Sequence, residues 1–250
     1  MGGIALGQVL AVVSGKGGTG KTSLCAGVAC CLAAEGKRVL CIDADVGLRN
    51  LDISLGMSQE PALPFTAVMR GEYTLDQAAV HPLYSNLHFL TAPVTEAPED
   101  LDGEQFARLL EQARQTYDWC LIDAPAGIGA GFRLAVSHAD QAMVVTGGDP
   151  AALRDGARTA EALEQCSRAQ AKIVVNRIRR KFFQRTRATV DDCMDIVGLP
   201  LLGIVPDDEA VVLAAASGQP LCRTSRKGAA LACLHIARRL CGIKQSLLNL

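Results

Sequence analysis

The sequence predicts an α/β fold in which a mostly parallel, twisted sheet of about seven strands carries helices on both faces. Short apolar runs rich in β-branched residues alternate along the chain with longer segments of helical periodicity. The runs at 9–13, 141–146 and 172–176 are almost continuously apolar, as expected for strands that are covered on both faces. No long linker or fixed-period repeat interrupts this alternation, so residues 1–250 are expected to form one domain.

Each expected strand is a short apolar run, and each expected helix is a longer segment between two such runs. The strands are expected at residues 9–13, 38–42, 87–91, 119–122, 141–146, 172–176 and 201–205. The helices are expected at residues 22–35, 103–116, 151–165, 190–197, 208–216 and 227–241. The segments 59–64 and 92–102 are expected to be surface connections. This order of elements predicts right-handed crossovers between parallel strands.

Charge and composition exclude several classes of protein. Lys and Arg number 25 and Asp and Glu number 26, and this net charge of −1 argues against a strongly basic nucleic-acid-binding protein. Hydrophobic residues make up 49% of the chain, but the longest apolar run, residues 24–34, is too short to cross a bilayer. The first residues lack the positively charged region of a signal peptide. A cytoplasmic protein is therefore expected.

The ten cysteines are interpreted as small core residues in a reducing cytoplasm. Most of them lie inside apolar helix or strand patterns. No CxxC pair occurs, which also argues against a protein that handles metals or clusters. The cysteines are Cys25, Cys30, Cys31, Cys41, Cys120, Cys166, Cys193, Cys222, Cys233 and Cys241.

The strongest motif is Gly-Lys-Gly-Gly-Thr-Gly-Lys-Thr at residues 15–22, which matches the pattern G-x-x-x-x-G-K-S/T. It follows an expected strand and opens an expected helix, which is the context that a phosphate-binding loop requires. Its glycines allow backbone N–H groups to turn inward around phosphate oxygens, and the helix N-terminus adds positive potential. Lys21 is expected to contact the β- and γ-phosphates, and the Thr22 hydroxyl is expected to ligate Mg²⁺.

Acidic residues follow two further strands. Asp43 and Asp45 come directly after the strand at 38–42, and Asp123 follows the strand at 119–122. Open α/β sheets place their ligand sites at these strand ends. One carboxylate can hold the Mg²⁺ shell while another orients an attacking water. Acidic residues also form ordinary turns, so this interpretation depends on the phosphate loop upstream.

A second lysine inside the loop, Lys16, is not required by an ordinary phosphate loop. With it, the loop resembles the deviant Walker A motif of the MinD/ParA family of ATPases, in which this lysine reaches the nucleotide of a partner subunit. Segments 43–56 and 123–127 resemble the MinD branch of that family, and the resemblance extends from residue 9 to about residue 241.

The resemblance implies a set of site residues for ATP and Mg²⁺. The catalytic residues would be Lys16, Lys21 and Asp45, and the residues that organise Mg²⁺ would be Thr22, Asp43 and Asp123. The phosphates would lie on Gly15, Lys16, Gly17, Gly18, Thr19, Gly20, Lys21, Thr22 and Ser23. The segments that flank the adenine in this family correspond here to Asn176, Arg177, Pro206 and Asp207. These last four residues could equally be ordinary turn residues at strand ends.

The implied function is an ATP-hydrolysing switch that forms a homodimer on ATP binding and works with a regulatory protein partner that stimulates hydrolysis. The implied role is division-site placement or another spatial positioning task. Two alternatives stay open, namely an FlhG-like ATPase of flagellar placement and a ParA-type nucleoid-binding ATPase of DNA segregation. The near-neutral charge weighs against nucleic acid as a partner. A basic segment at 177–187 is either a surface for anionic lipid or nucleic acid or a solvated connection.

The C-terminal end departs from the family pattern. Members of the MinD branch carry a basic amphipathic membrane anchor after the last core helix, whereas a short tail, residues 243–250, follows that helix here. An apolar stripe at spacings of four and three runs from Ala229 to Leu250. Residues 229–240 are expected to pack on the sheet. Residues 243–250 are a candidate for contact with a membrane or a partner. A membrane contact would place the protein peripherally at the inner face of the cell membrane.

Overall fold

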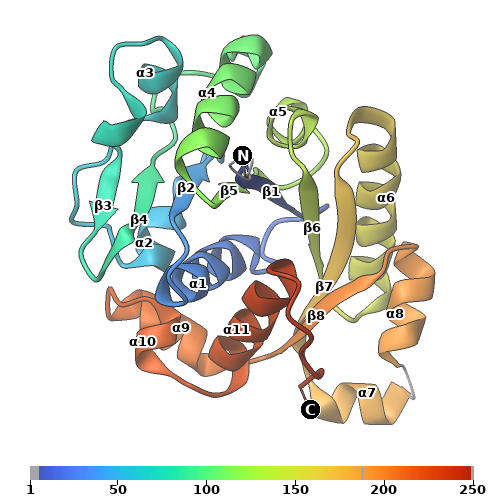
Figure 1. Cartoon of the computed structure of the whole chain (residues 1–250). Helices are drawn as coiled ribbons and strands as arrows, with labels where there is room; N and C mark the ends of the chain where they lie inside the picture. Colours follow the sequence, from blue (N-terminus) through green and yellow to red (C-terminus); the bar gives the residue numbers. More distant parts are fainter. Residues whose placement is uncertain (1–5, 187–188, 249–250) are drawn as a thin grey trace, which may run out of the picture.

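One sheet of eight strands runs through the computed structural model, which describes residues 6–186 and 189–248 (Figure 1). The strand order is β3-β4-β2-β5-β1-β6-β7-β8. Every neighbouring pair is parallel except β3 and β4. The strands are β1 (Gln8–Val13), β2 (Val39–Asp43), β3 (Ala79–His81), β4 (Tyr84–Leu90), β5 (Trp119–Asp123), β6 (Gln141–Thr146), β7 (Gln170–Ile178) and β8 (Leu201–Pro206). The predicted α/β class with a mostly parallel sheet is confirmed.

The strand that the sequence did not predict is β3. It has three residues and pairs antiparallel with β4 at the edge of the sheet, with a register shift between Val80 and His81. The Val80 side chain is 49% exposed, so the strand lacks the continuous apolar character of the central strands. A segment this short acquires its conformation from β4 rather than from its own residue pattern.

Helices cover both faces of the sheet, as predicted (Figure 1). One face packs against α1 and α11 together with α2, α9 and α10, and the other packs against α3, α4, α5, α6 and α8. The long helices are α1 (Lys21–Ala34), α4 (Gly103–Thr116), α5 (Ala130–Ser137), α6 (Pro150–Cys166), α8 (Val190–Val197), α9 (Glu209–Ala216) and α11 (Gly228–Leu240). The short helices are α2 (Leu51–Leu55), α3 (Phe65–Met69), α7 (Arg180–Thr186) and α10 (Leu221–Thr224), with 3-10 turns at η1 (Leu75–Gln77) and η2 (Pro98–Asp100).

Five helices, α2, α3, α5, α7 and α10, were not predicted from the sequence. An isolated helix of four to eight residues is unstable, so its formation depends on tertiary contacts. The structure shows such contacts for α2, in which Leu51 and Leu55 are fully buried, and for α3, in which Phe65 is fully buried. Burial of these side chains stabilises turns that local sequence alone leaves undecided.

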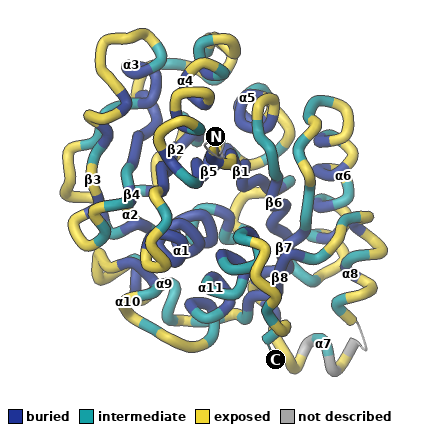
Figure 2. The backbone as a smooth tube through the Cα atoms, in the orientation of Figure 1, coloured by how far each residue is buried: buried dark blue, intermediate teal, exposed yellow. Residues whose placement is uncertain are grey.

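Helix α1, which follows the phosphate loop, is buried on almost every side (Figure 2). Its small residues allow close packing: a Cβ atom at Gly27 would lie 2.7 Å from the Sγ atom of Cys233 on α11. Three of the ten cysteines belong to this helix, and all ten are free thiols. Seven of the ten are fully buried, in agreement with the expectation that cysteine acts mainly as a core residue here.

The apolar stripe of residues 229–240 lies in the core, because α11 directs Ala229, Cys233 and Ile236 toward the sheet and α1. The tail beyond it is not helical over residues 243–248, and residues 249–250 lie outside the described part. Arg239 holds the tail by donating a hydrogen bond of 2.9 Å to the Gln245 carbonyl. Within the described ranges, no helix combines the length and hydrophobicity needed to cross a bilayer.

Candidate nucleotide-binding site

The predicted site residues lie at the carboxyl ends of the central strands, where the chain order reverses on either side of β1. Backbone hydrogen bonds join the loops that follow three neighbouring strands. The N–H of Ala44 donates to Asp123 O at 3.0 Å, and the N–H of Ala124 donates to Val12 O at 3.1 Å. The N–H of Gly127 then donates to the Ser14 carbonyl at 2.9 Å. The loops after β2, β5 and β1 therefore form one connected rim.

The phosphate loop is shaped by glycines at two close approaches. Gly20 has a φ of +87°, and a Cβ atom there would lie 2.3 Å from Nδ2 of Asn176. That same amide nitrogen donates a hydrogen bond of 2.7 Å to the Thr19 carbonyl. At Gly15 a Cβ atom would lie 2.6 Å from the Asp155 carbonyl on α6. Only glycine allows the loop to lie this close to β7 and α6.

Lys21 and Asp123 form a buried ion pair beneath the loop. The distance from Nζ to Oδ1 is 2.5 Å, and the side chains are 6% and 1% exposed. Lys21 Nζ also lies 3.4 Å from the Thr22 hydroxyl. Burial raises the pKa of Asp123, while Lys21 and Thr22 favour its charged form. The ion pair therefore connects the start of α1 to the end of β5.

Asp43 lies beside Asp123, because the two residues are register partners on β2 and β5. Its carboxylate is fully buried and accepts hydrogen bonds from the backbone N–H groups of Asp45 at 3.0 Å and Leu51 at 3.2 Å. Burial, together with the charge of Asp123, raises the pKa of Asp43 to about 7. The two hydrogen bonds act in the opposite direction and lower this pKa, but their effect is smaller. Two buried carboxylates this close form a site that favours a cation.

Asp45 lies on the loop after β2 and is only partly buried. The loop is held at one end by the Asp43 carboxylate and further along by Arg49, whose guanidinium donates hydrogen bonds of 3.2 and 3.1 Å to the Thr91 hydroxyl. Arg49 has a φ of +48°, which is uncommon for a residue with a side chain. This contact could not be predicted from local sequence, because Thr91 follows a strand 42 residues later.

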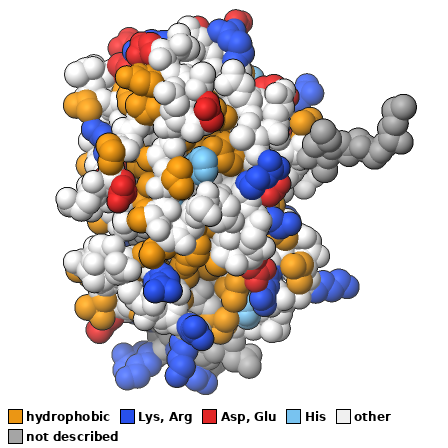
Figure 3. Space-filling view, turned by 60° about the vertical axis from the view of Figure 1, so that its left-hand side comes forward, with side chains coloured by type: hydrophobic (Ala, Val, Ile, Leu, Met, Phe, Trp, Pro, Cys, Tyr) orange, Lys and Arg blue, Asp and Glu red, His pale blue; other side chains and the backbone are white. Residues whose placement is uncertain are grey.

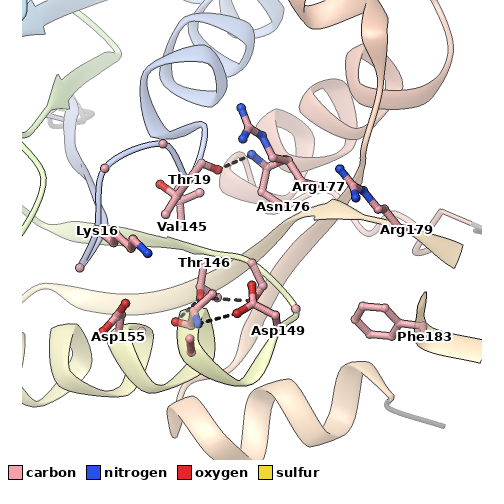
Figure 4. Close-up of a pocket in the computed structure, with 18 residues that line it drawn as sticks. Lys16, Thr19, Val145, Thr146, Asp149, Asp155, Asn176, Arg177, Arg179 and Phe183 are labelled. Carbon is pink, nitrogen blue, oxygen red and sulfur yellow. Dashed lines mark hydrogen bonds between the residues drawn. The ribbon is translucent and has the colours of Figure 1, made fainter. Parts of the chain in front are cut away.

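Two cavities adjoin the phosphate loop, and Asn176 and Arg177 line both of them. Figure 4 shows the larger of the two. The larger, of about 400 Å³, is lined by the loop residues Gly15 to Thr19, the segment after β6, the start of α6, and Arg179 and Phe183. The smaller, of about 80 Å³, is lined by Gly20 and Ser23 together with Pro206 and Asp207.

The structure thus separates the predicted residues into two groups. Asn176, Arg177, Pro206 and Asp207 come together around the smaller cavity, although they arise from two different strands. The three aspartates Asp43, Asp45 and Asp123 line neither of these two cavities and lie toward β2 and β5, on the other side of the loop. The three predicted aspartates therefore lie on one side of the loop, and the two cavities lie on the other.

Lys16 is exposed and lines the larger cavity, and Asp155 of α6 lines the same cavity (Figure 4). Sequence reasoning did not assign a site role to Asp155 or to Asp149, which also lines this cavity and caps α6 by accepting from the Ala152 N–H at 3.1 Å. The Asp-Pro pair that follows the apolar strand at 141–146 is the signal that could have indicated Asp149.

The loop fits a polyphosphate ligand. The Thr19 hydroxyl is buried and has no hydrogen-bond partner among the described residues, so it can accept or donate a bond to a ligand. No group of three or more His, Cys, Asp or Glu side chains within the described ranges is arranged to hold a metal ion. A Mg²⁺ ion here would consequently need the Thr22 hydroxyl, ligand phosphates and water in addition to carboxylates.

The basic segment 177–187 has more than one structural role. Arg177 lines both cavities, and its backbone has a φ of +55°. The Arg179 guanidinium forms an ion pair with the Asp207 carboxylate at 2.7 Å. Residues 180–186 form α7, where a solvated connection or a surface for anionic ligands was expected. Arg180, Lys181 and Arg185 are exposed there, and Arg187 lies outside the described residues.

Comparison with known proteins identifies the family. Residues 10–221 match the CobQ/CobB/MinD/ParA nucleotide binding domain. The chain belongs to this family. The CobQ/CobB/MinD/ParA match covers the phosphate loop, all three aspartates and both residues that line the two cavities. Membership makes the chain a P-loop nucleotide-binding ATPase of the MinD/ParA kind.

Within this family the chain is similar to septum site-determining proteins MinD. It is 39% identical over 238 residues to that of Synechocystis, covering 94% of this chain and 90% of the relative. It is 35% identical over 241 residues to that of Bacillus subtilis, covering 95% and 90%. The solved MinC:MinD cell division protein complex of Aquifex aeolicus aligns with a TM-score of 0.88 at 34% identity, covering 97% of this chain and 98% of that one.

Proposed function

We propose that this chain is an ATP-hydrolysing switch of the MinD type that acts in division-site placement. The observation that carries the proposal is the buried Lys21–Asp123 pair beneath a deviant phosphate loop, in a chain 35–39% identical to MinD proteins over nearly its full length. Flagellar placement and nucleoid segregation have less support. A ParA family ATPase of Chlorobium tepidum is only 22% identical, so that likeness concerns the fold alone.

The two sides of the loop suggest how ATP binds. The triphosphate would lie on residues 15–23, where the backbone N–H groups, the Thr19 hydroxyl and the Lys21 ammonium are available. The adenine would enter the smaller cavity between Asn176 and Arg177 on one side and Pro206 and Asp207 on the other. Asn176 offers an amide there, and its bond to Thr19 links the position of the base to that of the loop.

Thr22, Asp43 and Asp123 would hold Mg²⁺, directly or through its water shell. When bound, Mg²⁺ neutralises charge on the β- and γ-phosphates. A solved MinD of Pyrococcus horikoshii is described as complexed with Mg-ADP, at 24% identity and a TM-score of 0.80 over 94% of this chain and 96% of that one. A cation beside Asp43 would favour its ionised form, which burial disfavours in the ligand-free protein.

Hydrolysis requires a water molecule oriented in line with the γ-phosphate. Asp45 is suited to this task, because its backbone is held by Asp43 while its side chain is partly open to solvent. Lys21 and Lys16 would neutralise the charge that develops on the transferred phosphoryl group. Lys16 is exposed at the molecular surface, so it can reach a nucleotide bound to a second copy of the chain.

ATP binding would therefore close a homodimer, and hydrolysis would open it. The Aquifex MinD structure contains MinC, which favours a regulatory protein as a partner here too. Contact with the inner face of the cell membrane would involve the tail, where Ile243 and Leu247 are 47% and 44% exposed.

The switch can be tested by measuring phosphate release and molar mass by light scattering, with ATP and with ADP. The wild type should dimerise with ATP alone. Asp45→Ala should lose turnover by about a hundredfold or more and keep the ATP-dependent dimer, because it removes the orientation of water and not the binding of nucleotide. Lys16→Ala should remain monomeric with ATP. Turnover that survives in Asp45→Ala, or a Lys16→Ala dimer, would contradict these roles.

The membrane contact can be tested separately by sedimentation with anionic liposomes. Leu247→Glu should abolish ATP-dependent sedimentation, since it places a charge in the apolar contact. Val80→Glu is the matched control, because Val80 is similarly exposed but lies on β3, far along the chain from the tail. Sedimentation that is unaffected by nucleotide and by Leu247→Glu would rule out a tail-mediated membrane switch.

A further inference from the structure

The loop after β2 that carries Asp45 closes into a tight turn on the Asp45 backbone. The N–H groups of Leu48 and Arg49 both donate to the Asp45 carbonyl, at 3.3 and 3.2 Å. A Cβ atom at Gly47 would lie 3.8 Å from Oδ1 of Asp45, so the Asp45 carboxylate lies beside this turn. The position of the carboxylate therefore depends on how the turn is held.

Burial contributes little to holding the turn. Gly47, Leu48 and Arg49 are all exposed, and Leu48 is 70% exposed. An exposed turn opens easily unless hydrogen bonds fix it. Within the parts of the chain that the structure describes, the two bonds from the Arg49 guanidinium to the Thr91 hydroxyl are the only hydrogen bonds that the side chains of residues 46–50 make.

Arg49 combines this contact with an unusual backbone conformation. Its φ of +48° lies in the left-handed region, which a residue with a Cβ atom adopts at a cost. Such a conformation persists only where the surrounding structure determines it. At Arg49 the determinants are the backbone bond to Asp45 on one side and the guanidinium contact with Thr91 on the other. The residue thus links the Asp45 turn to a second strand.

Thr91 is a rigid anchor for this link. It is 5% exposed and directly follows β4. Its N–H donates to the Leu63 carbonyl at 2.9 Å, and its carbonyl accepts from the Phe65 N–H at 2.9 Å. Phe65 is itself fully buried. The Thr91 hydroxyl therefore has a defined position near the loop after β2, because β2 and β4 are neighbouring parallel strands.

Arg49 acts through one specific contact rather than through a basic surface. The elements next to Arg49 and Thr91, α2 and β4, lie on the left-hand side of Figure 1, which comes forward in Figure 3. Lys and Arg side chains are spread over that face between apolar and acidic ones (Figure 3). Among the described residues, Arg49 forms no ion pair. Its guanidinium is therefore committed to the Thr91 hydroxyl.

We propose that Arg49 is a positioning residue for ATP hydrolysis, and that its bonds to Thr91 hold the turn in which Asp45 orients the attacking water. In this role Arg49 does not touch the nucleotide and acts through the Asp45 backbone. The water must be held closely in line with the γ-phosphate, so a loosened turn lowers the rate of the chemical step without weakening the binding of ATP. This role of Arg49 rests on the proposed role of Asp45.

The contact is tested first in the nucleotide-free protein, by millisecond amide hydrogen exchange. Thr91→Val keeps the shape of the side chain and removes the acceptor, so the Leu48 and Arg49 amides should exchange faster. Thr91→Ser keeps a hydroxyl and should restore wild-type exchange. Arg70→Ala is the matched control, because the Arg70 guanidinium also holds a surface loop, through Glu96 at 2.6 Å, and it should leave both amides unchanged. Unchanged exchange in Thr91→Val would overturn the proposal.

Turnover of ATP then tests the positioning role. Thr91→Val should lower kcat about threefold to tenfold, with KM for ATP and the ATP-dependent dimer unchanged, and Thr91→Ser should restore kcat. Arg49→Gly relieves the strained φ but removes the guanidinium, so it should behave like Thr91→Val. Arg70→Ala should turn over ATP at the wild-type rate. A merely structural contact would not separate kcat from KM in this way.

The Asp45→Ala background separates the role of Arg49 from that of Asp45. Under single-turnover conditions, Asp45→Ala with Thr91→Val should hydrolyse ATP no more slowly than Asp45→Ala alone, because no carboxylate is left to position. A further threefold to tenfold loss in that background would overturn the role of Arg49. If Asp45→Ala keeps wild-type turnover, the proposed role of Asp45 fails and that of Arg49 fails with it. Wild-type kcat in Thr91→Val beside an inactive Asp45→Ala would overturn the role of Arg49 alone.

Discussion

The Lys21 ammonium and the Asp123 carboxylate lie 2.5 Å apart in the interior. Each charge neutralises the other, and either one would be costly to bury without its partner. The pair joins the first residue of α1 to the last residue of β5. A lysine that is expected to bind phosphate is therefore also a structural residue in the ligand-free protein.

Lys21→Ala should consequently reduce both stability and nucleotide binding. Its removal leaves Asp123 buried without a partner, and we expect the free energy of unfolding to fall by about 3 kcal/mol or more. Lys16→Ala is the matched control in the same loop, and because Lys16 is exposed its cost should stay within about 0.5 kcal/mol. Urea denaturation without nucleotide measures both. Equal stability of the two variants would show that the ion pair contributes nothing.

Asp43→Asn should change how stability depends on pH. In the unfolded chain Asp43 ionises near its ordinary pKa of 3.8, whereas in the folded protein its pKa is about 7. The folded state therefore binds more protons between these values, and wild-type stability falls as pH rises through this window. The asparagine loses one acceptor for the N–H of Asp45 or Leu51, a constant cost of about 1 kcal/mol.

Between pH 5 and pH 8, without Mg²⁺ and nucleotide, the wild type should lose about 2 kcal/mol relative to Asp43→Asn. Urea denaturation at several pH values gives this difference. A pH-independent difference between Asp43→Asn and the wild type would contradict the raised pKa.

His81 should make the β3–β4 hairpin sensitive to acid. Its buried ring donates from Nε2 to the Leu55 carbonyl at 2.9 Å and accepts at Nδ1 from the Leu83 N–H at 3.0 Å, which defines a neutral imidazole. Burial lowers its pKa below the ordinary 6.5. As the pH falls, the unfolded chain therefore takes up the proton first. The stability contribution that is present above pH 6.5 is lost as the pH falls below this value.

His81→Gln keeps a donor and an acceptor but does not titrate, so it should remove this part of the acid dependence. The exposed His138→Gln serves as the control and should leave the dependence unchanged. Amide hydrogen exchange of residues 79–90 at pH 5 and pH 7.5 would localise the effect. An identical acid dependence in His81→Gln and the wild type would argue against a neutral buried ring.

Gly20→Ala should disturb the link between the phosphate loop and β7. The added Cβ atom would lie 2.3 Å from the Asn176 amide, and the residue would also be strained at a φ of +87°. Gly18→Ala shares the strain, at +79°, but its Cβ atom meets nothing within 4 Å. We expect about 1 kcal/mol of destabilisation for Gly18→Ala and about 2–4 kcal/mol for Gly20→Ala.

A double-mutant cycle identifies the source of the difference. In an Asn176→Ala background the contact is absent, so the cost of Gly20→Ala should fall toward that of Gly18→Ala. Thermal or urea unfolding of the four proteins provides the coupling energy. If the cost of Gly20→Ala is the same with and without the Asn176 side chain, strain alone accounts for it.

The central part of the fold was predictable because its residue patterns are local. Seven parallel-sheet strands and the long helices other than α5 are contiguous segments with clear periodicity, and the phosphate loop is a contiguous motif. The hairpin strand β3 and the short helices α2 and α3 were not predictable, because contacts from distant residues stabilise them. Arg49 and Thr91 likewise meet only in the folded chain.

By itself the sequence determined the α/β class, the phosphate loop at 15–22 and the presence of acidic residues after two strands, since spacing along the chain encodes each of these. The tertiary structure decided which of those groups interact. Strand order places Asp43 beside Asp123, and burial then raises the pKa of one while Lys21 neutralises the other. The fold also brings the Asn176 amide to the Thr19 carbonyl across 157 residues of chain. Electrostatics and reactivity depend on distance and burial, and only the packing of distant segments sets both.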